Sequence, residues 1–152
     1  MMKKILSTTL LLSTLVLSPS SFAAGGPTGV GAIMGDPTGV SVKHWLTEST
    51  AIDAAFAWTL DDYNAFAIHA DYLLHVPQMV RIGKADFTMH YGVGGVLVLA
   101  DSSAFAFRAP LGLSYRFDSN PVDIFAEIAA LLLVAPSTDF DINVGIGARY
   151  YF

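Results

Sequence analysis

Beyond residue 24, apolar side chains alternate with small or polar ones at a period of two over several long stretches. In the clearest stretch, 104–117, one face is aromatic and aliphatic, and the other carries Arg, Ser and small residues. Residues 140–152 repeat this pattern. Such alternation indicates β-strands with one apolar face. No stretch here reaches the roughly 18 consecutive apolar residues of a transmembrane helix, so we predict an all-β chain.

Clusters of turn-forming residues separate the alternating stretches at near-regular intervals. The predicted connections are 35–37, 47–50, 61–64, 76–86, 100–103, 118–121 and 136–139. Seven connections join eight strands. Because each connection links neighbouring strands, the predicted fold is an eight-stranded antiparallel up-and-down β-barrel.

The first residues of the chain are typical of a targeting segment. A basic start with Lys3 and Lys4 precedes an apolar run at 5–17, and Ser21-Phe22-Ala23 supplies small residues for cleavage. We therefore expect a signal peptide at 1–23, removed by cleavage, and a barrel domain at 24–152; an uncleaved anchor is the alternative. Cleavage removes 2 of the 8 basic residues and none of the 13 acidic ones. An acidic mature chain argues against nucleic acid as a partner.

Three features favour a transmembrane barrel over a soluble sandwich or lipocalin-like barrel. The chain is 53% hydrophobic and 14% charged, whereas about 25% charged is usual for soluble domains. The predicted strands have the length of membrane strands, and their less apolar faces carry small residues suited to a narrow lumen. The aromatic residues should form two belts at opposite rims. One belt comprises Tyr72, Phe87, Tyr91, Tyr115, Phe117, Tyr150 and Phe152, and the other Trp58, Phe66, Phe105, Phe107 and Phe140.

The last six residues, Gly147-Ala148-Arg149-Tyr150-Tyr151-Phe152, combine a glycine with two alternating aromatics. In this ending and in its architecture the chain resembles small outer-membrane barrels of the OmpX and OmpA transmembrane-domain type. The resemblance implies a bacterial outer-membrane location among lipids and lipopolysaccharide. It also implies recognition by the outer-membrane assembly machinery through Gly147, Tyr150 and Phe152. It brings no established activity, and we expect a monomer.

Polar residues on the predicted inward faces have nearly balanced charges. They are Lys43, Asp53, His69, Asp71, Arg108, Arg116, Asp123, Glu127, Asp141 and Arg149. Because charges removed from water need partners, we predict a lumen polar network that plugs the barrel and leaves no open pore. A transport or proton-relay role is the alternative.

Toward the outer rim the inward positions become apolar. Ile33, Val96, Val98, Leu131 and Leu133 are predicted to line an upper-lumen pocket. Such a pocket could hold an acyl chain or another small hydrophobic ligand. The alternative is ordinary filling of the core.

Catalysis is the third functional hypothesis. His69, Asp71 and His75 share one strand face, but the outer-rim serines Ser102 and Ser103 lie far along the barrel from them. His69 and His75 are six residues apart on a strand, roughly 20 Å, which is too far to share a metal ion. The chain also lacks cysteine. We therefore predict no catalytic, metal or cofactor site, and a structural or envelope-integrity role.

Overall fold

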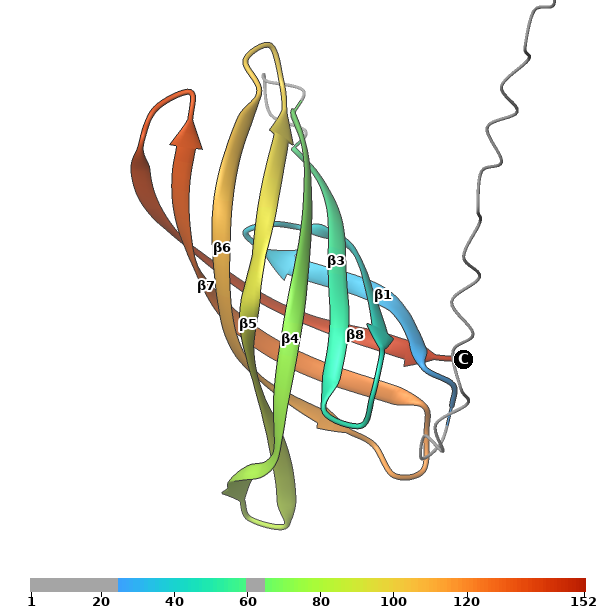
Figure 1. Ribbon diagram of the computed structural model, residues 1–152. Helices are drawn as coiled ribbons and strands as arrows, with labels where there is room; N and C mark the ends of the chain where they lie inside the picture. The colour runs from blue at the N-terminus through green and yellow to red at the C-terminus, as the bar shows by residue number, and fades with distance from the viewer. Residues whose placement is uncertain (1–24, 60–64) are drawn as a thin grey trace, which may run out of the picture.

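The computed structural model describes residues 25–59 and 65–152. Eight antiparallel strands, each paired with its neighbours in the chain, close into one barrel through pairing of the first with the last (Figure 1). They are β1 Thr28–Gly35, β2 Gly39–Trp45, β3 Thr50–Thr59, β4 Ala65–Ile82, β5 Ala85–Leu99, β6 Ala104–Arg116, β7 Val122–Ala135 and β8 Asp139–Tyr151. The predicted eight-stranded up-and-down barrel is confirmed. None of the described residues forms a helix long and apolar enough to cross a membrane.

Two predicted segments, the signal peptide at 1–23 and the connection at 61–64, lie outside the described residues. Of the other connections, five agree with the gaps between strands to within one residue: 35–37, 47–50, 100–103, 118–121 and 136–139.

The connection predicted at 76–86 is wrong, because β4 and β5 continue through it as a long hairpin. Strand pairing is interrupted between Val76 and Val80 and resumes as far as Ile82 and Ala85. Pro77 has no N–H to donate to a strand ladder, which suits it to such an irregularity. Gly83, with φ of +64°, supports the tight turn. The hairpin protrudes beyond the barrel at the end where Phe152 lies (Figure 1).

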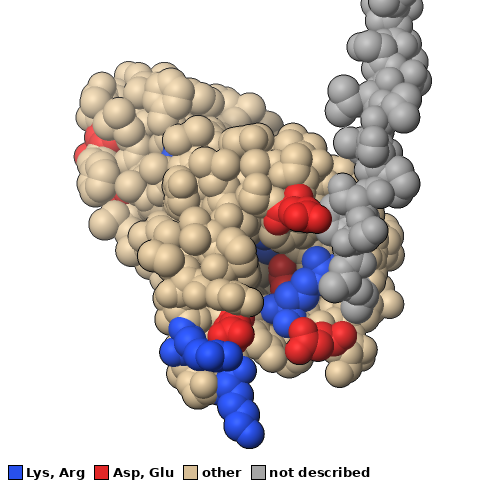
Figure 2. All heavy atoms as spheres, turned by 60° about the horizontal axis from the view of Figure 1, so that its bottom comes forward, with Lys and Arg blue, Asp and Glu red and all other residues tan. Residues whose placement is uncertain are grey.

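The two faces of the strands differ sharply in polarity. On β6, for example, Phe107 and Leu111 are exposed on the outside, whereas Arg108 is buried in the lumen. The wall in Figure 2 consists almost entirely of uncharged side chains, and charged ones gather at and inside the opening. The barrel thus has an apolar exterior and a charged interior, the reverse of a water-soluble protein.

Aromatic side chains group at both ends of this exterior. Phe87, Tyr115 and Phe117 contact one another in sequence, with ring centroids 5.5 and 5.0 Å apart, near the end that holds the chain terminus. At the other end Phe105 and Phe107 lie 5.3 Å apart in an edge-to-face arrangement. These pairs agree with the predicted belts.

One side of the barrel wall, formed by β1, β2 and the turn between them, is shorter than the rest, and we call it the low wall. β1 and β2 are 8 and 7 residues long, against 18 for β4, and their connecting turn ends well below the β5–β6 and β7–β8 turns (Figure 1). β1 pairs with β8 only as far as Gly145, and β2 pairs with β3 only as far as Ala57. The upper part of β8 therefore has β7 on one side and no strand on the other.

The free edge of β8 is capped by its own side chains. Val144 accepts a backbone hydrogen bond from Asp36 at the top of the low wall. Because every second residue of a strand directs its backbone to the same side, the N–H groups of Phe140 and Ile142 face the free edge. They donate instead to the carboxylates of Asp139 and Asp141, each over 2.8 Å.

We expect Asp139→Ala to expose this edge. The Phe140 amide should exchange its hydrogen about fivefold faster, since a hydrogen bond contributes about 1 kcal/mol net. Amide exchange measured by NMR on the folded barrel tests this, with the exposed neighbour variant Ser137→Ala as control. Unchanged exchange at Phe140 in Asp139→Ala would show that the carboxylate does not cap the edge.

Candidate functional site

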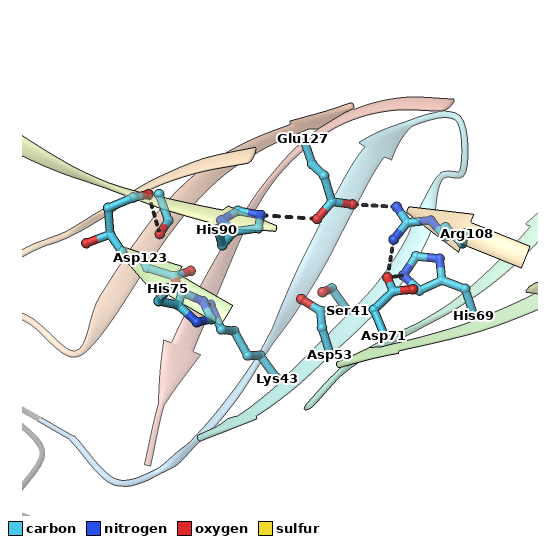
Figure 3. A network of polar contacts seen from close by, with 12 residues as sticks. Ser41, Lys43, Asp53, His69, Asp71, His75, His90, Arg108, Asp123 and Glu127 are labelled. Carbon is cyan, nitrogen blue, oxygen red and sulfur yellow. Dashed lines mark hydrogen bonds and ion pairs between the residues drawn. The ribbon is translucent and has the colours of Figure 1, made fainter. Parts of the chain in front are cut away.

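The lumen holds a continuous set of buried polar side chains (Figure 3). We call it the lumen network. Its members come from every strand except β1: Ser41, Lys43, Asp53, His69, Asp71, His75, His90, Arg108, Asp123, Glu127, Arg149 and Tyr151. They are buried because alternation turns these positions inward, where eight strands leave room only for side chains or a small ligand.

Arg108 forms the upper part of the lumen network. Its guanidinium donates to Asp71 through Nη1 and to Glu127 through Nη2, so that one cation bridges β4, β6 and β7. Glu127 also accepts from His90 Nε2 over 3.2 Å. A planar guanidinium suits this position because its several N–H donors lie in a fixed fork.

Arg149 forms a second part closer to the chain termini. Its Nε donates to the Ser41 hydroxyl over 2.9 Å, and its Nη2 donates to Asp53. The Asp123 carboxylate lies 3.9 Å from Nη1 and accepts the Tyr151 hydroxyl over 2.7 Å. These contacts connect β2, β3, β7 and β8 across the closing seam of the barrel.

A third part joins Lys43 to a row of rings. Lys43 Nζ donates to His75 Nε2 over 2.7 Å and lies 4.5 Å from the Trp45 ring centroid. The His75 ring is 4.3 Å from Trp45 and 5.6 Å from His90. His90 thereby links this part to the Arg108 part.

Two inward glycines leave room for the network. A Cβ at Gly112 would lie 2.4 Å from His90 Nε2, and one at Gly94 would lie 2.0 Å from Asp71 Oδ1. Both distances are far inside normal contact, so no larger residue fits while these side chains keep their places. The small residues on the less apolar strand faces therefore leave the space in which the charged side chains pair.

Most of the residues predicted for the lumen network belong to it. Lys43, Asp53, His69, Asp71, Arg108, Glu127 and Arg149 are buried there. Arg116 is half-buried, with its guanidinium 4.1 Å from the Tyr151 ring centroid.

Asp141, in contrast, does not belong to the network. It is exposed, and its carboxylate accepts the Ile142 N–H. The physical reason is the low wall: Asp141 lies beyond Gly145, the last residue of β8 that pairs with β1, so no strand faces it there.

Ser41, His90 and Tyr151 were not among the predicted network residues. Asp123 is among the residues predicted inward, and His75 is considered above for catalysis and for metal binding. The alternation signal that places Arg149 inward also places Tyr151 inward. The same signal places His90 inward, since Val96 and Val98 on its strand are predicted inward and Tyr91 outward.

Above the network lies a cavity of about 210 Å³, which we call the upper cavity. Its lining combines residues of β4 to β7 with residues of the low wall and the β8 edge: Asp36, Pro37, Ala67, His69, Val96, Val98, Ala104, Phe105, Ala106, Leu131, Leu133, Asp141 and Asn143. Four of the five residues predicted for an apolar pocket line it: Val96, Val98, Leu131 and Leu133.

Ile33 does not line the upper cavity. It packs instead with Ala55 and Phe125 in a separate apolar cluster. The reason is again the short β1: Ile33 pairs with Gly39 and Gly147, where the Phe125 ring also reaches, and no part of β1 extends beyond Gly35.

The predicted assembly residues lie in two environments. Gly147 faces inward against Phe125, whose ring a Cβ would meet at 2.5 Å. Tyr150 and Phe152 are exposed on the outside of the closing strand.

Histidines of the lumen network bond to Lys43, to Glu127 and to a backbone carbonyl. Ser41 is bonded to Arg149, and the Ser114 hydroxyl lies 3.5 Å from the Thr88 carbonyl. No hydroxyl of the described serines is bonded to a histidine; His75 Nδ1 bonds the backbone carbonyl of Ser49 over 3.3 Å. No group of three or more potential ligands among them could hold a metal ion. No family model, curated protein or solved structure matches the chain.

We expect Arg108→Met to lower the free energy of unfolding by about 3–5 kcal/mol, since removing one partner leaves uncompensated buried carboxylates. Urea unfolding of the detergent-folded barrel measures this. Adding Asp71→Asn and Glu127→Gln to the variant should restore part of the loss.

The control for this prediction is Arg81→Met. Arg81 pairs with Asp86 over 2.8 Å, but its side chain is 70% exposed, so its loss should cost less than about 1 kcal/mol. Equal effects of the two substitutions would contradict a bridging role for Arg108.

Proposed function

We propose that the protein is a bacterial outer-membrane barrel that contributes to the structure and integrity of the envelope, with a plugged lumen and no open pore. The observation that carries this proposal is the reversed polarity of the barrel, apolar outside and charged inside. A closed barrel is one of the two structures that satisfy all backbone groups in hydrocarbon, and transmembrane barrels of this kind occur in outer membranes.

The exterior supports a lipid environment. Large side chains exposed there include Val93, Leu97, Ile128, Val144 and Ile146, and aromatic groups lie at both ends. A monomer in water would rarely expose so large a continuous apolar surface. Membrane lipids and lipopolysaccharide are the partners we propose for this surface. Assembly into the membrane would follow recognition of the last strand.

The lumen network supports the absence of a pore. Arg108 and Arg149 each bond to carboxylates of other strands, and the buried rings of His75 and His90, with centroids 5.6 Å apart, occupy further lumen space. Side chains that bond across a narrow barrel stiffen it and exclude a continuous water column. We propose no enzymatic activity and no cofactor.

Binding of a small hydrophobic ligand is a second candidate function. The observation that favours it is the upper cavity, where Val96, Leu131 and their neighbours leave about 210 Å³ unfilled. A purely structural barrel does not need this space.

We expect the full chain, expressed in a Gram-negative host, to fractionate with the outer membrane. It should migrate differently on gels before and after boiling, because a closed barrel resists unfolding by detergent at room temperature. The Arg108→Met variant should lose the folded band at a lower temperature. Recovery in the soluble periplasm without a mobility difference would contradict the membrane proposal.

We also expect no stable ion conductance from the purified barrel in planar bilayers. Removing the upper network with Asp71→Ser, Arg108→Ser and Glu127→Ser should admit water and raise the conductance. Arg81→Ser with Asp86→Ser removes an exposed ion pair and is the matched control. Steady conductance of the unaltered protein would overturn the plugged lumen.

A further inference from the structure

The upper cavity has two chemically different sides. Its high side is formed by β4 to β7 and is apolar, with Val96, Val98, Leu131 and Leu133 packed around Ala106. Its low side is formed by the β1–β2 turn and the β8 edge, and it is polar, with Asp36, Asp141 and Asn143. The polar lining thus lies where the barrel wall is low.

Among the described residues of the lining, the charges are of one sign. The ionisable ones are Asp36, Asp141 and His69, and His69 is 4% exposed. The cations beneath are occupied, since Arg108 bridges Asp71 and Glu127. A bound carboxylate would meet two like charges and, among the described lining residues, no Lys or Arg, whereas a bound cation would meet opposite charges.

The cavity volume limits the size of the ligand. An engineered cavity of about 150 Å³ binds one benzene molecule, and the upper cavity has about 210 Å³. One small ring or a short chain therefore fits this space.

We propose that the upper cavity binds small apolar cations, with the apolar group against β5–β7 and a protonated amine at Asp36 and Asp141. The ligand enters over the low wall. This inference rests on the second candidate function and changes its ligand class, from acyl chains to compact amines. Asp141 is available for this role because the free β8 edge leaves it outside the lumen network. One of its oxygens accepts the Ile142 N–H, and a carboxylate has further acceptor positions.

The test uses three probes of similar size that differ in charge: benzylamine, benzyl alcohol and benzoate. Each is titrated into the full barrel in nanodiscs with labelled Val and Leu methyl groups. Methyl shifts at Val96, Val98, Leu131 and Leu133 should saturate with benzylamine at about a tenfold lower concentration than with benzyl alcohol, and benzoate should give none. Equal binding of the amine and the alcohol would overturn the cation proposal while keeping an apolar cavity.

Variants locate the amine and the apolar group separately. Asp141→Asn and Asp36→Asn should each weaken benzylamine about threefold and leave benzyl alcohol unchanged. Asp101→Asn, an exposed acidic residue on the β5–β6 turn that does not line the cavity, is the matched control. Val98→Phe should fill the cavity and abolish binding of both probes.

The outcomes separate this inference from the proposed membrane function. If none of the probes shifts the cavity methyl groups, both the cation site and the ligand-binding candidate are overturned. The outer-membrane proposal is then still decided by fractionation and heat-dependent mobility. If Asp101→Asn weakens benzylamine as much as Asp141→Asn does, general surface charge explains the binding and the specific site is overturned.

Discussion

The bridging of buried carboxylates by Arg108 and Arg149 is the interaction on which the rest of the lumen depends. An isolated buried charge is far costlier than a paired one, so the four carboxylates Asp53, Asp71, Asp123 and Glu127 could not face inward without these guanidiniums. Each arginine contacts carboxylates from two other strands. Because each guanidinium holds separate strands in one register, the same contacts that neutralise the lumen also fix the cross-section of the barrel.

The position of the network along the barrel determines where empty space remains. Long side chains such as Arg108, Lys43 and Tyr151 fill the part toward the chain termini, aided by inward glycines that let them approach the wall. Above Arg108 the inward residues are Val, Leu and Ala, which are too short to meet across the lumen. The upper cavity is therefore a consequence of side-chain length on a barrel of fixed strand number, and His69 marks the boundary between the two regions.

The sequence was sufficient for features that depend on alternation within one strand. Strand number, inward or outward phase and most of the network followed from it, because a residue's neighbours two positions away share its face. Features that depend on the length of the neighbouring strand were missed. Asp141 has an inward phase like Arg149, but only Arg149 faces a β1 residue, Gly31. Likewise the segment 76–86 indicated a loop, although its two strands pair again from Val80 onward. How far a strand is paired depends on the length of its neighbours, which cannot be inferred from the alternation within one strand.

The short β1–β2 hairpin connects these observations physically. If β1 extended to the height of Asp141, that carboxylate would be enclosed among Val98, Leu131 and Leu133 without a cation, at a cost of several kcal/mol. An acidic residue at this point is compatible with the apolar high wall only because the opposite wall is low. The low wall in turn creates a free strand edge, which is a liability for uncontrolled pairing, and Asp139 and Asp141 cap it. The Asp141 carboxylate thus caps the free strand edge and also gives the cavity negative charge. The preference of the cavity for cations therefore follows from the shortness of β1 and β2.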